Sequence, residues 1–182
     1  MKAAIGLVEL SSIAKGIEVS DAMLKRANVE LIVNRTICPG KYMILIGGDV
    51  DAVNASVETG VELAEAEIVD HFIIPNVHPS IFPALHGINV TEELNALGVI
   101  ESFSVASIIE CADAAVKAAP VTLITVYLAM AIGGKGYVMF TGDVGSVQSA
   151  VEAGASVIKS KGLLVQKVVI PSPRKEVLKQ WI

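Results

Sequence analysis

The stretch Ile5–Glu9 reads Ile-Gly-Leu-Val-Glu, and it returns 92 residues later as Leu-Gly-Val-Ile-Glu at Leu97–Glu101. At the same spacing, Asp-Ala-Met-Leu-Lys at Asp21–Lys25 returns as Asp-Ala-Ala-Val-Lys at Asp113–Lys117. Similar segments that recur in the same order are typical of an internal repeat. The sequence therefore predicts two homologous halves, each able to form the same fold.

The repeat continues beyond these segments with small changes of spacing, which are expected in loops. Lys41 corresponds to Lys135 at a spacing of 94 residues, and the last matched segments are 96 residues apart. A polar segment around Thr91 separates the two halves. We therefore predict a first domain over residues 1–91 and a second over residues 92–182.

Each half alternates short apolar segments, typical of strands, with segments of helical period. The predicted strands are Ala3–Leu10, Leu31–Ile37, Tyr42–Ile46, Ile68–Ile74, and, in the second half, Val121–Ala129, Tyr137–Phe140 and Leu163–Ile170. The predicted helices are Ser12–Ala27, a segment after Asp49, Pro79–Leu85, and a segment after Asp143. The order β-α-β-β-α-β predicts an α+β fold in each half, with an antiparallel sheet and flanking helices in a ferredoxin-like layer.

Two features of the predicted helices can be checked against a structure. Asp49 and Asp143 stand where an N-cap is expected, because a carboxylate there can accept backbone N–H groups. The first helix carries its larger apolar side chains at helical spacing, which is typical of a core-facing stripe. These residues are Ile13, Ile17, Leu24 and Ala27.

The composition excludes several classes of protein. Hydrophobic residues make up 53% of the chain, yet the longest apolar run, Val121–Ile132, is shorter than the roughly 20 residues of a membrane-spanning helix. No secretory signal pattern is visible at the N-terminus. The net charge of −5 argues against a nucleic-acid-binding surface. We expect part of the apolar excess to be covered by other subunits.

One turn carries a thiol between two predicted strands. The segment Thr36–Lys41 reads Thr-Ile-Cys-Pro-Gly-Lys. Pro39 lacks a backbone donor and Gly40 permits positive φ, so a tight turn with Cys38 at its rim is predicted. On the residues alone, Cys38 is more readily a small, partly buried turn side chain than a ligand. The matching turn at Ile132–Lys135 contains two glycines and no cysteine, and it lacks the full phosphate-loop pattern.

No catalytic or metal-binding set emerges from the remaining polar residues. Cys111 corresponds to Val19 in the first half, which predicts a core position, and a disulfide to Cys38 stays open. Glu9 and Glu101 occupy repeated strand ends without a basic partner nearby in the sequence. Three histidines have no metal-ligand spacing and are expected in loops or on the surface: His71, His78 and His86. The chain is therefore expected not to be an enzyme.

Taken together, these segments resemble the bacterial microcompartment shell domain, twice over and along nearly the whole chain. The matching pieces are Ser20–Lys25, Ile37–Lys41, Gly48–Val50 and Val53–Val61, then Asp113–Lys117, Ile132–Lys135 and Gly142–Val144. Two such domains in one chain are similar to the tandem class, in which three chains form a pseudohexameric tile with a central pore. The resemblance thus implies a homotrimer in a cytoplasmic microcompartment shell, with other shell proteins as lateral partners.

The turn at Thr36–Lys41 is similar to that of the T type of propanediol-utilisation shells. This implies that Cys38 from three chains holds a [4Fe–4S] cluster on the three-fold axis, with a redox partner enzyme in the lumen. Lys25 and Lys117 are implied at the tile edge, and Lys41 is a candidate to offset the cluster's negative charge. The implied pore residues are Ile37, Pro39, Gly40, Lys41, Ile132, Gly133, Gly134 and Lys135.

Two alternatives remain open from the sequence. In the first, the tile has an empty pore that passes metabolites. In the second, the chain is a soluble oligomeric binding module of ferredoxin-like fold, whose two glycine turns hold a small anion.

Overall fold

The computed structural model describes residues 4–87, 94–128, 132–174 and 176. The chain divides into two compact units, the first comprising residues 1–77 and 129–134 and the second residues 78–128 and 135–182. Three predicted boundary residues lie outside the described residues: Ala3, Thr91 and Ala129.

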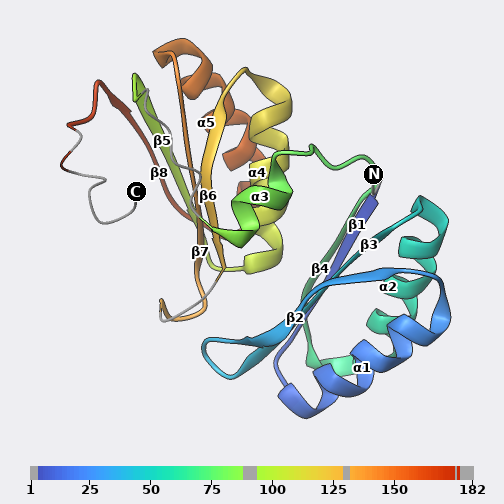
Figure 1. Cartoon of the computed structure of the whole chain (residues 1–182). Coiled ribbons are helices and arrows are strands. Elements are labelled where there is room, and N and C mark those ends of the chain that lie inside the picture. Colours follow the sequence, from blue (N-terminus) through green and yellow to red (C-terminus); the bar gives the residue numbers. More distant parts are fainter. Residues whose placement is uncertain (1–3, 88–93, 129–131, 175, 177–182) are drawn as a thin grey trace. The chain divides into compact units, whose positions relative to one another are not determined.

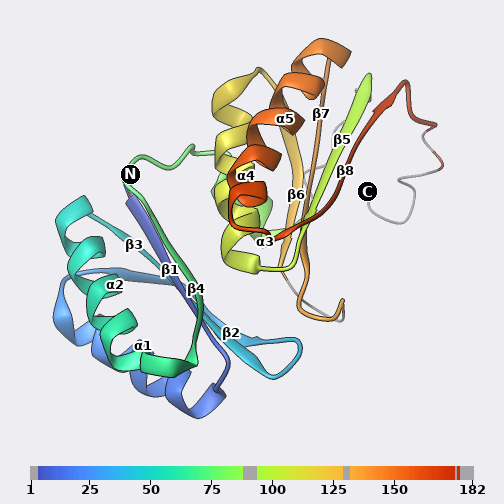
Figure 2. The same cartoon turned by 180° about the vertical axis from the view of Figure 1, so that it is seen from behind.

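The first unit is one antiparallel sheet with two helices on one of its faces (Figures 1 and 2). Its elements are β1 (Ala4–Leu10), α1 (Ile13–Arg26), β2 (Glu30–Ile37), β3 (Lys41–Gly48), α2 (Val50–Ala64), the 3-10 turn η1 (Glu65–Glu67) and β4 (Ile68–Ile74). The strands lie in the order β2-β3-β1-β4. This arrangement confirms the predicted ferredoxin-like topology.

The second unit repeats this design. Its elements are α3 (Ile81–His86), β5 (Ala96–Ser102), α4 (Val105–Ala118), β6 (Thr122–Leu128), β7 (Gly136–Gly142), α5 (Val144–Ser160) and β8 (Leu164–Pro171). The strand order is β6-β7-β5-β8, and α4 and α5 cover one face of the sheet (Figure 2). The α+β fold class is therefore confirmed in both halves, with element ends within a few residues of those predicted.

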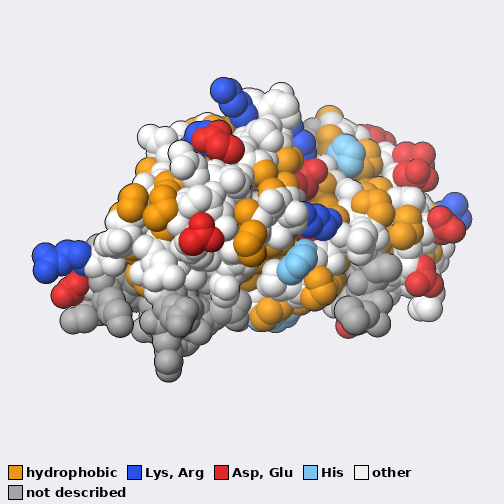
Figure 3. Space-filling model, turned by 90° about the horizontal axis from the view of Figure 1, so that it is seen from above, with side chains coloured by type: hydrophobic (Ala, Val, Ile, Leu, Met, Phe, Trp, Pro, Cys, Tyr) orange, Lys and Arg blue, Asp and Glu red, His pale blue; other side chains and the backbone are white. Residues whose placement is uncertain are grey.

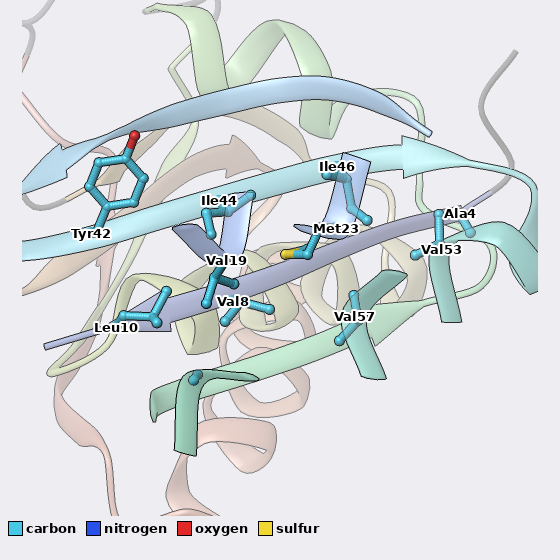
Figure 4. Packing of buried hydrophobic residues seen from close by; sticks show 11 residues of the cluster. Ala4, Val8, Leu10, Val19, Met23, Tyr42, Ile44, Ile46, Val53 and Val57 are labelled. Atoms are coloured by element: carbon cyan, nitrogen blue, oxygen red, sulfur yellow. The ribbon is translucent and has the colours of Figure 1, made fainter. Parts of the chain in front are cut away.

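The core of the first unit lies between its sheet and its two helices (Figure 4). It combines strand residues of β1 and β3 with Val19 and Met23 of α1 and Val53 and Val57 of α2, and these four helix residues are at most 1% exposed. The helix α1 approaches the sheet closely at Gly16, where an added Cβ would lie 2.4 Å from Cγ of Tyr42. A larger residue at this position would push α1 away from β3.

The predicted inward face of α1 is wrong. The residues of this helix that are buried are Gly16, Val19, Ser20 and Met23. The larger apolar residues of the predicted stripe point outward, with Ile13 39%, Ile17 57% and Leu24 39% exposed. The reason is the close approach at Gly16, because only a face of small and slender side chains fits against Tyr42. Helical periodicity identified an apolar face but could not tell that it faces away from the unit's own sheet.

The two predicted helix caps behave differently. Asp143 caps α5, accepting the backbone N–H of Ser146 at 2.9 Å and the hydroxyl of the same residue at 2.5 Å. These hydrogen bonds, led by that of the Ser146 hydroxyl, lower the pKa of Asp143 below its usual value. Asp49 occupies the N-cap position of α2 but makes no side-chain capping bond, so that part of the prediction is wrong. The third residue after Asp49 is Ala52, which has no hydroxyl to hold the carboxylate in place as Ser146 does for Asp143.

Candidate functional site

The turn with Cys38 is the tip of the β2–β3 hairpin. Ile37 pairs with Lys41, so only residues 38–40 form the connection. Gly40 has φ +70°, and a Cβ built there would meet nothing within 4 Å. Cys38 is a free, half-buried thiol, while Pro39 and Gly40 are exposed. The predicted tight turn is thus confirmed, and it presents one thiol near its rim.

The second glycine turn lies beside this thiol turn. Residues 132–134 belong to the first compact unit, and Gly133 and Gly134 have φ +66° and +83°. A Cβ added to Gly134 would lie 2.8 Å from Cδ of Pro39 and 2.9 Å from the carbonyl oxygen of Cys38. Glycine is therefore required at position 134 for the two turns to lie this close.

A buried ion pair at the base of the thiol turn was missed by the sequence analysis. Lys41 Nζ lies 2.6 Å from Oε1 of Glu9, whose side chain is fully buried, and the Lys41 side chain is only 17% exposed. In the second unit, Lys135 Nζ lies 2.5 Å from Oε1 of Glu101. The pair could not be recognised from the sequence, because Glu9 and Lys41 lie on different strands, far apart along the chain. One sequence signal pointed to the pair: a glutamate and a lysine occupy equivalent positions in both halves of the chain.

This ion pair changes the expectation for Lys41. A charge buried with its partner is already balanced, and removing either member leaves an uncompensated buried charge at a cost of about 3–5 kcal/mol. The ammonium of Lys41 is held by Glu9, so it supplies little net positive charge at the turn. Its evident role is to fix the first residue of β3, directly after the turn that carries Cys38.

Cys111 is a core residue, as its correspondence to Val19 predicted. It is fully buried on α4, and a Cβ added to Gly154 of α5 would lie 2.9 Å from its Sγ. Burial raises the pKa of the Cys111 thiol to about 12. Both cysteines are free, so the disulfide left open by the sequence is not formed in the structure.

A metal site within one chain finds no support in the described part of the chain, where no group of three or more His, Cys, Asp or Glu could hold an ion. His78 has its Nδ1 2.7 Å from the hydroxyl of Ser80, and His86 has its Nδ1 2.8 Å from the carbonyl oxygen of Phe82. His71 is exposed on β4.

The two lysines expected at an edge differ in how firmly they are held. Lys25 Nζ lies 2.5 Å from Oδ2 of Asp21, and these side chains are 74% and 63% exposed. Lys117 Nζ lies 2.5 Å from Oδ2 of Asp113, whose side chain is only 8% exposed. Asp113 also accepts the backbone N–H of His78 at 2.7 Å. Lys25 and Lys117 occupy equivalent positions in the repeat, but Lys25 is solvated whereas Lys117 is anchored by a buried carboxylate.

The surface shows no large area of one charge on the face in Figure 3, where acidic and basic side chains lie scattered among hydrophobic ones. Among the described residues, no helix is both long enough and apolar enough to cross a membrane.

The contrast between the two thiols yields a labelling prediction. In native protein treated with a metal chelator, we expect iodoacetamide at about pH 8.5 to modify Cys38 and spare Cys111. The thiolate is the reactive form, and a thiol with a pKa of about 12 stays protonated at this pH. Mass spectrometry after digestion measures the modification of each site. Both thiols should react in urea, and rapid native labelling of Cys111 would contradict its assignment to the core.

Comparisons with known proteins agree with this geometry. The BMC domain family matches residues 4–77 and 96–173, once in each half. The chain is 48% identical to the bacterial microcompartment shell protein PduT of Citrobacter freundii, over 100% of this chain and 99% of that protein. It is 33% identical over 85 residues to the carboxysome shell protein CcmK2 of Synechococcus elongatus, covering 44% of this chain and 83% of that protein.

A solved structure matches nearly the whole chain. The crystal structure of a microcompartment protein from Desulfitobacterium hafniense superimposes with a TM-score of 0.87 at 48% identity, covering 97% of this chain and 98% of that one. The match to CcmK2 thus covers about half of this chain, whereas the matches to PduT and to the solved structure cover nearly all of it. The chain belongs to the BMC-domain family of bacterial microcompartment shell proteins, with two such domains in tandem.

Proposed function

We propose that three copies of this shell protein close into a pseudohexameric tile, and that Cys38 of each copy binds one [4Fe–4S] cluster at the central pore. The observation that carries the proposal is the single free thiol at the tip of a hairpin, directly beside the glycine turn of the other repeat. The cluster would serve electron transfer across the shell or delivery to a partner enzyme.

The exposure of repeated helix positions supports a ring. On α1, Ile13 and Ile17 are 39% and 57% exposed, whereas the equivalent Val105 and Ile109 on α4 are fully buried. The same face of the repeat is therefore covered in the second unit and open in the first. An apolar face of this kind is expected to bind another protein surface.

The helix-free face of the sheets shows the opposite asymmetry. Phe72 and Ile74 on β4 are 4% and 8% exposed, whereas the equivalent Val168 and Ile170 on β8 are 41% and 37% exposed. Each chain thus leaves one apolar helix face open in its first unit and one apolar sheet face open in its second. Two different surfaces that complement one another make a head-to-tail contact, which closes into a ring when the rotation allows. Three chains with two domains each give the six positions of the family's tile.

The ring predicts that charges at either open surface dissociate it. We expect Ile17→Asp and Val168→Asp to convert the trimer to monomer at micromolar concentration, because each would bury an unpaired carboxylate in the contact. Light scattering coupled to size exclusion measures the mass. Lys25→Glu is the control, since it changes an exposed charge on the same helix and should leave the trimer intact. A trimer that persists in both Asp variants would contradict the ring.

We further propose that Lys25 and Lys117 lie at the edge between tiles. Their aliphatic stems can lie flat across the contact while the ammonium groups donate to neighbouring carbonyls. The double variant Lys25→Glu with Lys117→Glu should remain trimeric and fail to form extended sheets in electron micrographs. If this variant forms normal sheets, the proposal that Lys25 and Lys117 lie at the tile edge is wrong.

The residues fit a cluster shared between chains. A [4Fe–4S] cluster is held chiefly by cysteine thiolates, and this chain offers one suitable thiol beside a turn with open space around Gly40. Three chains would supply thiolates to three irons, leaving the fourth to a small molecule or a partner protein. When bound, the cluster would supply one-electron transfer. Glu9 and Lys41 keep the base of the turn fixed, so that the three thiols approach the axis in the same geometry.

The cluster is tested by substituting Cys38, the one thiolate that each chain would supply. We expect Cys38→Ser, purified without oxygen, to remain trimeric and lose its iron and the broad absorption near about 400 nm typical of such clusters. Iron and acid-labile sulfide analysis provide the measurement. Cys111→Ala is the matched control and should keep about one cluster per trimer. If reconstituted wild type binds no iron, or if Cys38→Ser retains it, the tile has a plain pore suited to small metabolites.

A further inference from the structure

The short helix α3 and the residues just before it cover part of the second unit, where α3 packs against α4 and the edge strand β6 (Figure 1). Ile81 and Ala84 of α3 are at most 1% exposed. His78 donates its backbone N–H to the buried carboxylate of Asp113 on α4 at 2.7 Å. This segment follows β4, the last strand of the first unit. The chain thus leaves one repeat and covers a helix and an edge strand of the next.

The equivalent surface of the first unit, formed by α1 and β2, is open. Leu31 of β2 is 37% exposed, whereas its equivalent on β6, Leu123, is 1% exposed. Ile17 of α1 is 57% exposed. The side chain of Asp21 is 63% exposed, whereas that of its equivalent, Asp113, is 8% exposed. The described residues of this chain therefore leave the α1–β2 surface exposed to water.

The sequence contains a second segment like α3, after β8, the last strand of the second unit. The Ile-Pro pairs that end the two sheets, at residues 74–75 and 170–171, are 96 residues apart, and this spacing aligns α3 with residues 177–182. Those six residues, as many as α3 contains, lie outside the described residues. The aligned apolar residues are Ile81 with Val177, Phe82 with Leu178, and Leu85 with Trp181.

From this alignment we propose that residues 174–182 form a C-terminal strap, which covers the α1–β2 surface of a neighbouring chain. The segment after β4 packs on the repeat that follows it in the chain. In a head-to-tail ring, the repeat that follows the second unit is the first unit of the next chain. The inference rests on the proposed ring and adds to it a named link between chains.

The strap makes the two kinds of contact that α3 makes. Its apolar side chains lie against Ile17 of α1 and Leu31 of β2, which removes both from water. The backbone N–H of Arg174, equivalent to that of His78, donates to the carboxylate of Asp21. The first unit of each chain thereby receives from its neighbour the cover that the second unit receives from its own chain.

Trp181 is the only tryptophan of the chain, so its fluorescence reports on the strap. In native full-length protein we expect acrylamide to quench it at least about threefold less than in urea, because a covered indole ring is shielded from the quencher. Ile17→Ser and Leu31→Ser should raise the quenching. Val144→Ser is the matched control, since it removes a comparably exposed apolar side chain from α5 and should leave the quenching unchanged.

Light scattering on the same samples separates the strap from the ring. A trimer in which Trp181 is quenched as strongly as in urea would overturn the strap and leave the ring intact. A monomer would contradict the ring, and with it the cover by a neighbouring chain. Equal effects of Val144→Ser and Leu31→Ser would show that the strap does not lie on the α1–β2 surface.

A photo-crosslink then identifies the chain that is covered. With p-benzoylphenylalanine in place of Leu178, we expect a product of two chains on a denaturing gel, and a crosslinked peptide that maps to α1 or β2 by mass spectrometry. The same probe in place of Phe82 is the matched control and should crosslink within one chain, to α4 or β6. If the probe at position 178 gives only single-chain products, or links to another element, the strap does not cover the neighbour.

Discussion

Each unit has a four-stranded sheet with apolar side chains on both faces, while its own two helices cover only one face. In the first unit, the helix-free face carries Leu7, Met43 and Leu45, all fully buried. In the second, the corresponding face leaves Val168 and Ile170 well exposed. A sheet that is apolar on both sides must be covered on both sides, because water would otherwise contact several aliphatic side chains. The proposed ring would cover the face that is left exposed in the second unit.

The same constraint explains the unusual composition. A chain that is 53% hydrophobic carries more apolar surface than a monomer needs for one core per domain. The excess is found on the outward stripe of α1 and on β8, and not spread evenly over the surface. The small residues on the inward side of α1, led by Gly16, keep the helix close to Tyr42. They leave the larger Ile13 and Ile17 exposed, where the proposed ring would cover them.

The internal repeat lets one half of the molecule serve as a reference for the other. Where the two halves agree, as in the Glu–Lys pairs at the base of both turns, the feature belongs to the shared fold. Where they differ, one half carries a side chain that the shared fold does not require. Only the first turn carries a thiol, and of the equivalent Lys25 and Lys117 only Lys117 is anchored by a buried carboxylate. Lys167 pairs with Glu152 between α5 and β8, at a position where the first unit has His71. The two domains of the chain thus share a fold and differ in these side chains.

The sequence by itself determined the repeat, the order of the strands and helices, the thiol turn and the family. Each of these depends on local pattern or on matching segments, and both are visible in one dimension. Only the tertiary structure decided which face of α1 is inward, because periodicity defines a face but not its neighbour. It also decided the partner of Glu9, since Lys41 lies 32 residues away and meets it only when β1 and β3 pair. Likewise, the cover that α3 gives to α4 and β6 appears only in the structure, because a contact between separate segments is a property of the folded chain.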